Sequence, residues 1–184
     1  MEKPSALAEM TVGGLAGHLM HQIFSASAVL QEPASAEAPI PLLEHYARAV
    51  WVDDRLTAKS TRVSGRGGAD CLRGCAAAAG ASSRALAELQ AELPAMPGDA
   101  AVFIPWGGWA LTLNDFLVTR MMELAVHMDD LAVSVGITTP EIAGAAFEPV
   151  LTLLTHLSVR RHGQAALLRA LSRVERAPSA INAL

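Results

Sequence analysis

Hydrophobic residues recur every three or four positions along most of this chain, which is the spacing of one face of an α-helix. The longest such runs predict helices over residues 12–30, 42–62, 69–93, 112–136 and 141–175. Segments rich in proline or glycine separate the runs, and only AVFIP (101–105) has the character of a short strand. No alternation of strands and helices indicates a parallel sheet. The pattern therefore predicts an all-α bundle.

Several residues mark where these helices begin and end. Thr11 is a favourable N-cap for the first helix. Thr112 and Asp115, three positions apart, are typical of a capping box that opens the fourth helix. Gly136 is expected to end that helix, and the dipeptide His162-Gly163 is expected to divide the last segment.

The composition suits one compact domain over residues 1–184, a length that can bury a sizeable core. A net charge of −4 and a pI near 5.8 give little electrostatic support for binding nucleic acid. No apolar run approaches the ~18 residues of a membrane span. We therefore expect neither a nucleic acid nor a membrane as partner.

Two cysteines, Cys71 and Cys75, lie four positions apart. That spacing fits neither a disulfide framework nor a zinc-binding CxxC pair. The N-terminus, MEKPSALAEM, has no basic flank before an apolar core and is not expected to be a signal peptide. We expect a reduced protein in the cytoplasm, with both cysteines acting as small buried residues.

The fourth helix carries charged residues inside an apolar run, RMMELAVHMDDLA (120–132). At about 100° per residue, one arc of roughly 80° holds four of them: Arg120, Glu123, His127 and Asp130. Asp129 points to the opposite side of the helix. The stripe could form ion pairs within the helix that face water, or it could line a site.

Glu123 and His127 are one turn apart, so a carboxylate and an imidazole leave the same helical face and can bind one divalent cation. A third ligand must come from another helix, and GHLMH in the first helix offers His18, with His21 in reserve. Three protein ligands and an open position are typical of a catalytic zinc site. Nickel, iron and cobalt also suit imidazole and carboxylate ligands, so the spacing alone does not identify the metal. Asp130 is placed to accept the second ring N–H of His127.

Two segments together resemble a known family: TVGGLAGHL (11–19) and TRMMELAVHMDDLA (119–132). They are similar to the mycothiol-dependent maleylpyruvate isomerase N-terminal domain, a branch of the DinB-like metal-binding bundles. That family shows the pattern TV-G-L-x-x-HL and, far downstream, R-x-x-E-x-x-x-H-x-x-DL, and every position of both is matched here. The ending RRHGQAALLRALSRVERAP (160–178) looks like a short actinobacterial subgroup of the family.

The resemblance implies a DinB-like four-helix bundle, here with an additional C-terminal helix. It also implies a divalent metal, zinc in preference to nickel or iron, held by His18, Glu123 and His127. Family members usually carry a helix ahead of the TVG motif, whereas only ten residues precede it in this sequence. We therefore expect a missing or very short N-terminal helix. An apolar groove would then lie beside the first and fourth helices, covered in a homodimer.

The implied function is that of an enzyme that uses mycothiol or a similar small thiol against an electrophilic small-molecule substrate. Coordination to a metal deprotonates a thiol. The thiolate could add to an alkene and leave again, which is isomerisation, or stay attached, which is S-transfer. Arg120 would neutralise Glu123 or hold a substrate carboxylate, and Asp130 would orient His127. The alternatives are a non-catalytic bundle for sensing or sequestering a metal or ligand, and a structural protein without metal.

Five arginines lie between residues 160 and 176. Their spacing could place Arg169 and Arg173 on one helical face. These two residues would then bind the cofactor, as part of an anion-binding surface for the thiol or an acidic substrate. The same face could simply be solvated. In the IPWGGW loop, Trp106 and Trp109 could form a rim over the pocket or fill the core.

Overall fold

The computed structural model describes residues 3–8, 10–49 and 75–184. It begins with helices α1 (Val12–Val29), α2 (Leu42–Arg48) and α5 (Cys75–Glu92), and the 3₁₀ turn η1 (Leu93–Ala95). A hairpin of β1 (Ala101–Ile104) and β2 (Trp109–Thr112) follows. The remaining elements are α6 (Leu113–Val135), α7 (Gly144–His162), α8 (Gln164–Ser172) and the 3₁₀ turn η2 (Val174–Arg176). This mainly helical structure confirms the predicted all-α class with an additional C-terminal helix.

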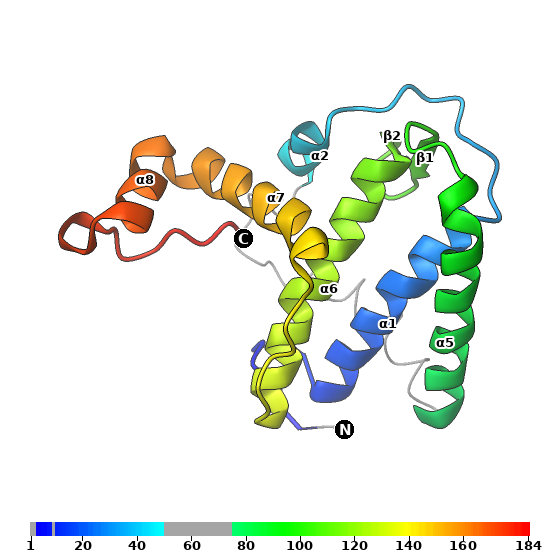
Figure 1. The fold of residues 1–184 in the computed structure, drawn as a ribbon, viewed down its shortest axis with the longest axis horizontal. Helices are drawn as coiled ribbons and strands as arrows, with labels where there is room; N and C mark the ends of the chain where they lie inside the picture. The colour runs from blue at the N-terminus through cyan, green and yellow to red at the C-terminus, as the bar shows by residue number, and fades with distance from the viewer. Residues whose placement is uncertain (1–2, 9, 50–74) are drawn as a thin grey trace.

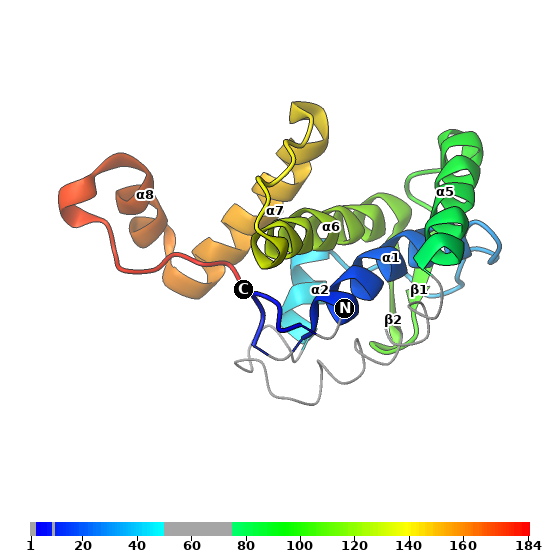
Figure 2. The same ribbon diagram turned by 90° about the horizontal axis from the view of Figure 1, so that it is seen from below.

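The longest of the described helices, α6, lies at the centre of the fold (Figure 1). Helix α1 packs against it, α5 covers α1 from the outside, and α7 packs against a different part of α6. Helix α8 extends away from this bundle at the outer end of α7, as Figure 2 also shows. The arrangement leaves α1 and α6 side by side, with the polar stripe of α6 toward α1.

Local sequence signals set most of the helix ends. The hydroxyl of Thr11 caps α1 by accepting a hydrogen bond of 3.0 Å from the backbone N–H three residues later. Thr112 caps α6 in the same way, also at 3.0 Å. Helix α6 ends at Gly136, whose φ of 74° is left-handed, and Gly163, with φ 85°, separates α7 from α8. These predicted boundaries are confirmed.

The helix predicted over residues 42–62 is wrong in its extent, because α2 ends at Arg48. Ala49 has an extended backbone, with φ −72° and ψ 108°. Its side chain is almost completely buried. Packing of Ala49 into the core therefore overrides the helix preference of an alanine.

Some predictions concern residues outside the described part of the chain. These are the remainder of the helix predicted to residue 62, the beginning of the helix predicted from Ala69, and the environment of Cys71. The helix from Ala69 is described from Cys75 onward, as α5, although the side chain of Cys75 is not.

The strand predicted for AVFIP is confirmed as β1, and β2 pairs with it in an antiparallel hairpin that no sequence pattern indicated. Ile104 lies opposite Trp109 at the turn. Gly108 has a left-handed φ of 75°. A Cβ on Gly107 would lie 2.6 Å from the Trp109 ring. The last strand runs directly into Thr112, so the hairpin sets where α6 begins.

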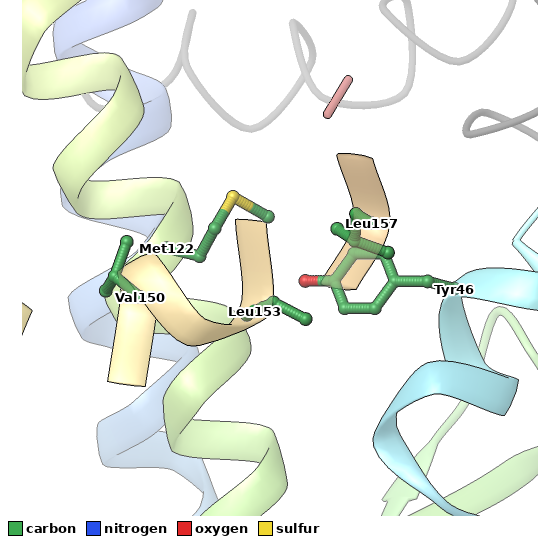
Figure 3. Close-up of a cluster of buried hydrophobic side chains, with 5 residues drawn as sticks. All are labelled: Tyr46, Met122, Val150, Leu153 and Leu157. Atoms are coloured by element: carbon green, nitrogen blue, oxygen red, sulfur yellow. The ribbon is translucent and has the colours of Figure 1, made fainter. Parts of the chain in front are cut away.

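Two buried clusters hold α6 in place. One joins α2, α6 and α7 and is drawn in Figure 3: Tyr46, Met122, Val150, Leu153 and Leu157. The other joins the hairpin to the first turn of α6: Val102, Ile104, Leu111, Leu113 and Phe116. Because both clusters use apolar sides of α6, its charged stripe is left to face α1.

Residues 3–8 and 10–11 form no helix. These residues instead form an isolated bridge between Pro4 and Thr11, and the N–H of Val12 donates to the carbonyl of Lys3 at 2.9 Å. Among the described helices, none is long and apolar enough to cross a membrane.

Candidate metal centre

Three candidate ligands meet between α1 and α6. His18 comes from the second turn of α1, and Glu123 and His127 lie one turn apart on α6. Nε2 of His18 lies 3.0 Å from Oε2 of Glu123, and Nε2 of His127 lies 3.3 Å from the same oxygen. One ligand atom from each residue lies within 4.8 Å of the others. The structure thus brings together the three side chains that the sequence singled out, as a group that could hold a metal ion.

This group, called the metal group below, is partly buried. The side chains of His18, Glu123 and His127 are 11%, 16% and 20% exposed. The two imidazole rings meet edge to face, with centroids 4.7 Å apart. A stripe of ion pairs facing water would be far more exposed, so that interpretation does not describe this face of α6.

Asp130 sets the orientation of the His127 ring. Oδ2 of Asp130 lies 2.9 Å from Nδ1 of His127. A carboxylate accepts but does not donate, so Nδ1 of His127 carries a hydrogen toward Asp130. Nε2 of the same ring faces Glu123 at 3.3 Å and is the atom through which His127 would bind a metal. Two imidazole nitrogens and one carboxylate oxygen are a donor set that suits zinc.

The charges around the group keep its carboxylate ionised. Burial alone would raise the pKa of Glu123, but hydrogen bonds from His127 and His18 and the positive charges of His127 and Arg120 outweigh it and hold that pKa far below its usual range. Burial alone would lower the pKa of His127, but Glu123 and Asp130 outweigh it and raise that pKa. The site therefore carries a fixed negative charge that attracts a cation.

Arg120 is largely buried on the same face of α6. Its Nη1 donates to Oε1 of Gln22 on α1, and its Nε donates to Oγ1 of Thr119 at 3.1 Å. The guanidinium carbon lies 5.4 Å from the centroid of the Phe116 ring. Within the described residues, Arg120 forms no ion pair with Glu123. Burial lowers the pKa of Arg120, and the nearby carboxylate offsets part of that effect.

Gln22 is the residue of this site that the sequence analysis did not single out. It lies on α1 one turn after His18 and is only 1% exposed. Its Nε2 lies 3.0 Å from Nε2 of His18. A signal was present, because a glutamine on the buried face of an apolar helix requires polar partners.

Other predicted site residues lie elsewhere. His21, the reserve ligand, is exposed and has its Nε2 3.3 Å from the hydroxyl of Ser25, outside the metal group. Arg169 lies on α8, and Arg173 follows it; both are exposed. Because α8 extends away from α1 and α6 (Figure 1), the structure does not bring these arginines to the metal group.

The two tryptophans form an aromatic cluster with His45 of α2. Nε1 of Trp109 donates to Nδ1 of His45 at 3.1 Å, and the centroids of Trp106 and Trp109 are 5.6 Å apart. Trp109 is partly buried, whereas Trp106 is 59% exposed. Trp109 therefore fills space inside the fold, whereas Trp106 lies at its surface.

His45 makes the fold sensitive to acid. Burial, with a smaller contribution from the charge of Arg120, lowers the pKa of His45 from 6.5 to about 4. Between these values the unfolded chain binds a proton that the folded chain does not bind. The free energy of unfolding should therefore decrease as the pH falls through this window, by about 1–2 kcal/mol once screening by solvent is included.

Urea unfolding at about pH 7.5 and about pH 4.5 measures this loss. The control is His45→Gln, since a glutamine oxygen can still accept from Trp109 but does not titrate. The variant should lose less stability between the two pH values than the wild type. The same loss in both proteins would mean that His45 is not responsible.

The family described as the mycothiol maleylpyruvate isomerase N-terminal domain matches residues 1–132. The three candidate ligands, Arg120 and Asp130 all lie within this range. No curated protein and no solved structure shows significant similarity to the chain. The family match covers well over half of the 184 residues. The chain therefore belongs to the mycothiol maleylpyruvate isomerase N-terminal domain family.

Proposed function

We propose that this protein is a metal-dependent enzyme in which a small thiol, mycothiol or a close analogue, attacks an electrophilic substrate. The proposal rests on the convergence of His18, Glu123 and His127 at one partly buried group that could hold a metal ion. Zinc is the proposed metal, and nickel or iron would fit the same donors. Membership of a mycothiol-related family supports the thiol. A reduced cosubstrate of this kind is consistent with a cytoplasmic location.

Each side chain of the site has a task in this proposal. A divalent cation held by the metal group would supply the Lewis acidity that deprotonates a thiol at neutral pH. Glu123 provides the negative charge that offsets the cation, while His18 and His127 provide neutral nitrogen donors. Asp130 keeps the His127 ring in place through the 2.9 Å contact. Arg120 provides a positive charge and a planar set of N–H groups that suit a substrate carboxylate.

Two reactions are open to such a nucleophile. In isomerisation, the sulfur forms a bond to one carbon of an activated alkene, the carbon–carbon bond rotates, and the carbon–sulfur bond breaks again to release the thiol. In S-transfer, the carbon–sulfur bond stays, and either the neighbouring carbon takes up a proton or a leaving group departs with the bonding electrons. A carboxylate on the substrate would be recognised by Arg120 in both reactions.

Thiol consumption tests the proposal directly. Zinc-loaded protein should consume mycothiol in the presence of an electrophilic probe, and protein stripped with a chelator should not. Consumption that is equal with and without metal would contradict the proposal. Stoichiometric zinc without any consumption would instead assign the protein to metal binding, for sensing or sequestration.

We also propose that two copies of the chain form a homodimer through α8. No residue of α8 is buried, and Leu168 and Leu171 are 65% and 72% exposed. Helix α8 packs against α7 and η2 and otherwise extends away from the bundle (Figures 1 and 2). Exposed apolar surface of this kind marks an interaction site.

The groove proposed to receive α8 lies between α6 and α7. It has a volume of about 410 Å³ and an apolar lining: Ala125, Val126, Met128, Phe147, Val150 and Leu154. Asp129 and Glu141 are exposed residues of the same groove. Arg169 and Arg173 accompany the leucines of α8. The arginines of α8 and the acidic residues of the groove have complementary charges, which favours the α8 helix of a second copy as the occupant of the groove. The arginines would then lie at the acidic rim of the groove and not at a bound thiol.

Sedimentation at micromolar concentration tests the dimer. The wild type should have twice the mass of the 19.3 kDa chain. Replacing both Leu168 and Leu171 by Asp should give a monomer, because two charges would have to enter an apolar groove. Leu86→Asp, at an exposed leucine of α5, should leave the dimer intact. A monomeric wild type, or a dimer that persists in the double variant, would rule out this interface.

A further inference from the structure

We infer that residues 181–184, called the clasp below, hold α8 in the position from which it can bind a second copy of the chain. Ser158 and His162 of α7 are the positioning residues that fasten this clasp. The consequence for dimer formation rests on the proposed α8 interface. The effect on α8 itself is a property of a single chain and can be measured separately.

Helix α8 contributes little to its own stability. It is nine residues long, and none of its residues is buried. Isolated helices shorter than about 12 residues are marginal in water, because the first turn is costly to form. The hydroxyl of Ser172 donates within the helix, to the carbonyl of Leu168 at 2.6 Å, and so adds no link to the bundle. Contacts made outside α8 must therefore keep it folded and in place.

The connection between α7 and α8 does not by itself fix the direction of α8. The two helices are joined at Gly163, whose backbone has φ 85° and ψ 153°. A glycine adopts several backbone conformations at low cost, including those with positive φ. A single glycine between two helices is therefore a hinge that permits several angles. A second attachment is needed to select one of them.

The chain after η2 supplies the second attachment, since it runs back from α8 to α7 (Figures 1 and 2). Oγ of Ser158 donates to the carbonyl of Ile181 at 2.7 Å. Nε2 of His162 lies 2.8 Å from the carbonyl oxygen of Asn182. A carbonyl only accepts, so this ring nitrogen is the donor. Ser158 and His162 are one turn apart on the same side of α7, and they bind two successive carbonyls of the clasp.

Burial makes the clasp difficult to replace by water. Ser158 is only 3% exposed. Ala183 packs against the cluster around Tyr46 that holds α7 on α6. Loss of the Ser158 hydroxyl would leave the partly buried carbonyl of Ile181 without this donor, which is costly for a group shielded from solvent. The clasp thus combines a polar anchor with an apolar one, and it closes residues 163–180 into a loop whose two ends are fixed on α7.

A closed clasp presents the residues of α8 that the proposed dimer would use. Leu168 and Leu171 are three positions apart, so they share a face only while α8 is helical. A partner copy binds this ordered form, and the apparent dissociation constant increases as the ordered fraction falls. By ordering α8 in advance, the clasp lowers the cost of dimer formation.

Amide hydrogen exchange of residues 164–180 measures the clasp in a single chain. The background is Phe147→Asp, which places a charge in the proposed groove and leaves α8 unchanged, so that a partner does not protect α8. Adding Ser158→Ala should accelerate exchange in α8 by about 2–10-fold, the effect expected from one hydrogen bond. Adding Ala183→Asp should accelerate it further, because a carboxylate would have to enter the apolar cluster. Exchange in α6 should be the same in all these proteins, which would show that the effect is local.

The matched control is Thr155→Ala. This change also removes a hydroxyl from α7, but that hydroxyl donates within the helix, to the carbonyl of Thr152 at 2.8 Å. Exchange in α8 should not change. Unchanged exchange in both clasp variants, Ser158→Ala and Ala183→Asp, would overturn the inference.

Sedimentation, with Phe147 restored, measures the consequence for the dimer. The double variant Ser158→Ala/Ala183→Asp should dimerise at least about tenfold more weakly than the wild type, and Thr155→Ala should dimerise equally well. Faster exchange in α8 without any loss of dimer would overturn the positioning role of the clasp. Faster exchange in a protein whose wild type is monomeric would support the clasp and refute the proposed α8 interface.

Discussion

Replacing His127 by Ala is expected to remove most of the bound metal and leave a folded helical protein. The variant loses one of three ligands, and the two that remain, His18 and Glu123, come from different helices and cannot enclose a cation alone. The His127 side chain is partly exposed and lies outside both buried clusters, so the fold should tolerate its truncation. Elemental analysis should give about one zinc per wild-type chain and a small fraction of that in the variant, with unchanged helical circular dichroism.

The matched control is His156→Ala, which removes an exposed histidine of α7. It should retain wild-type zinc. If His127→Ala also retained one zinc per chain, the assignment of His18, Glu123 and His127 as ligands would be wrong.

Replacing Asp130 by Asn should weaken zinc binding by about 10–100-fold without unfolding the protein. The amide keeps the shape of the side chain, and its oxygen can still face Nδ1 of His127. It lacks the negative charge that strengthens the 2.9 Å contact and makes the ring a better donor to a metal. If the contact were only an ion pair, the change would alter stability by ~0.5 kcal/mol and leave affinity unchanged. Competition with a chelator of known affinity measures the difference.

Asp129→Asn is the internal control for this experiment. Asp129 is exposed on the side of α6 that lines the groove toward α7, where its carboxylate accepts from the hydroxyl of Thr139. It has no contact with the metal group, so its substitution should not change zinc affinity. Equal affinities for the wild type and both variants would leave Asp130 with no role in metal binding.

The sequence predicts those parts of the fold that local signals determine. Thr112 caps α6 and Gly136 ends it because a side-chain hydroxyl and a left-handed backbone act within a few residues. The spacing of Glu123, His127 and Asp130 likewise follows from the geometry of one helix. His18 was placed opposite them by the family motif, because a helix pattern alone does not identify its partner 105 residues away.

Features that depend on tertiary packing could not be predicted in the same way. Helix α2 ends where the buried Ala49 enters the core, although alanine favours a helix. Strand β2 exists because β1 pairs with it, and its sequence contains no alternation that indicates a strand. The contact between Gln22 and Arg120 depends on the register between α1 and α6, which brings the guanidinium to the amide oxygen. The separation of α8 from the metal group likewise follows from the angle at Gly163, which no residue spacing reveals.

X-ray absorption at the zinc edge, with and without mycothiol, reports the atoms bound to the metal. We expect only nitrogen and oxygen neighbours in the thiol-free protein, from two imidazoles and one carboxylate together with solvent. After mycothiol is added, one sulfur neighbour should appear at about 2.3 Å. A sulfur neighbour before any thiol is added would implicate cysteine and refute the proposed ligand set of His18, Glu123 and His127. A spectrum that does not change at saturating mycothiol would refute binding of the thiol to the metal.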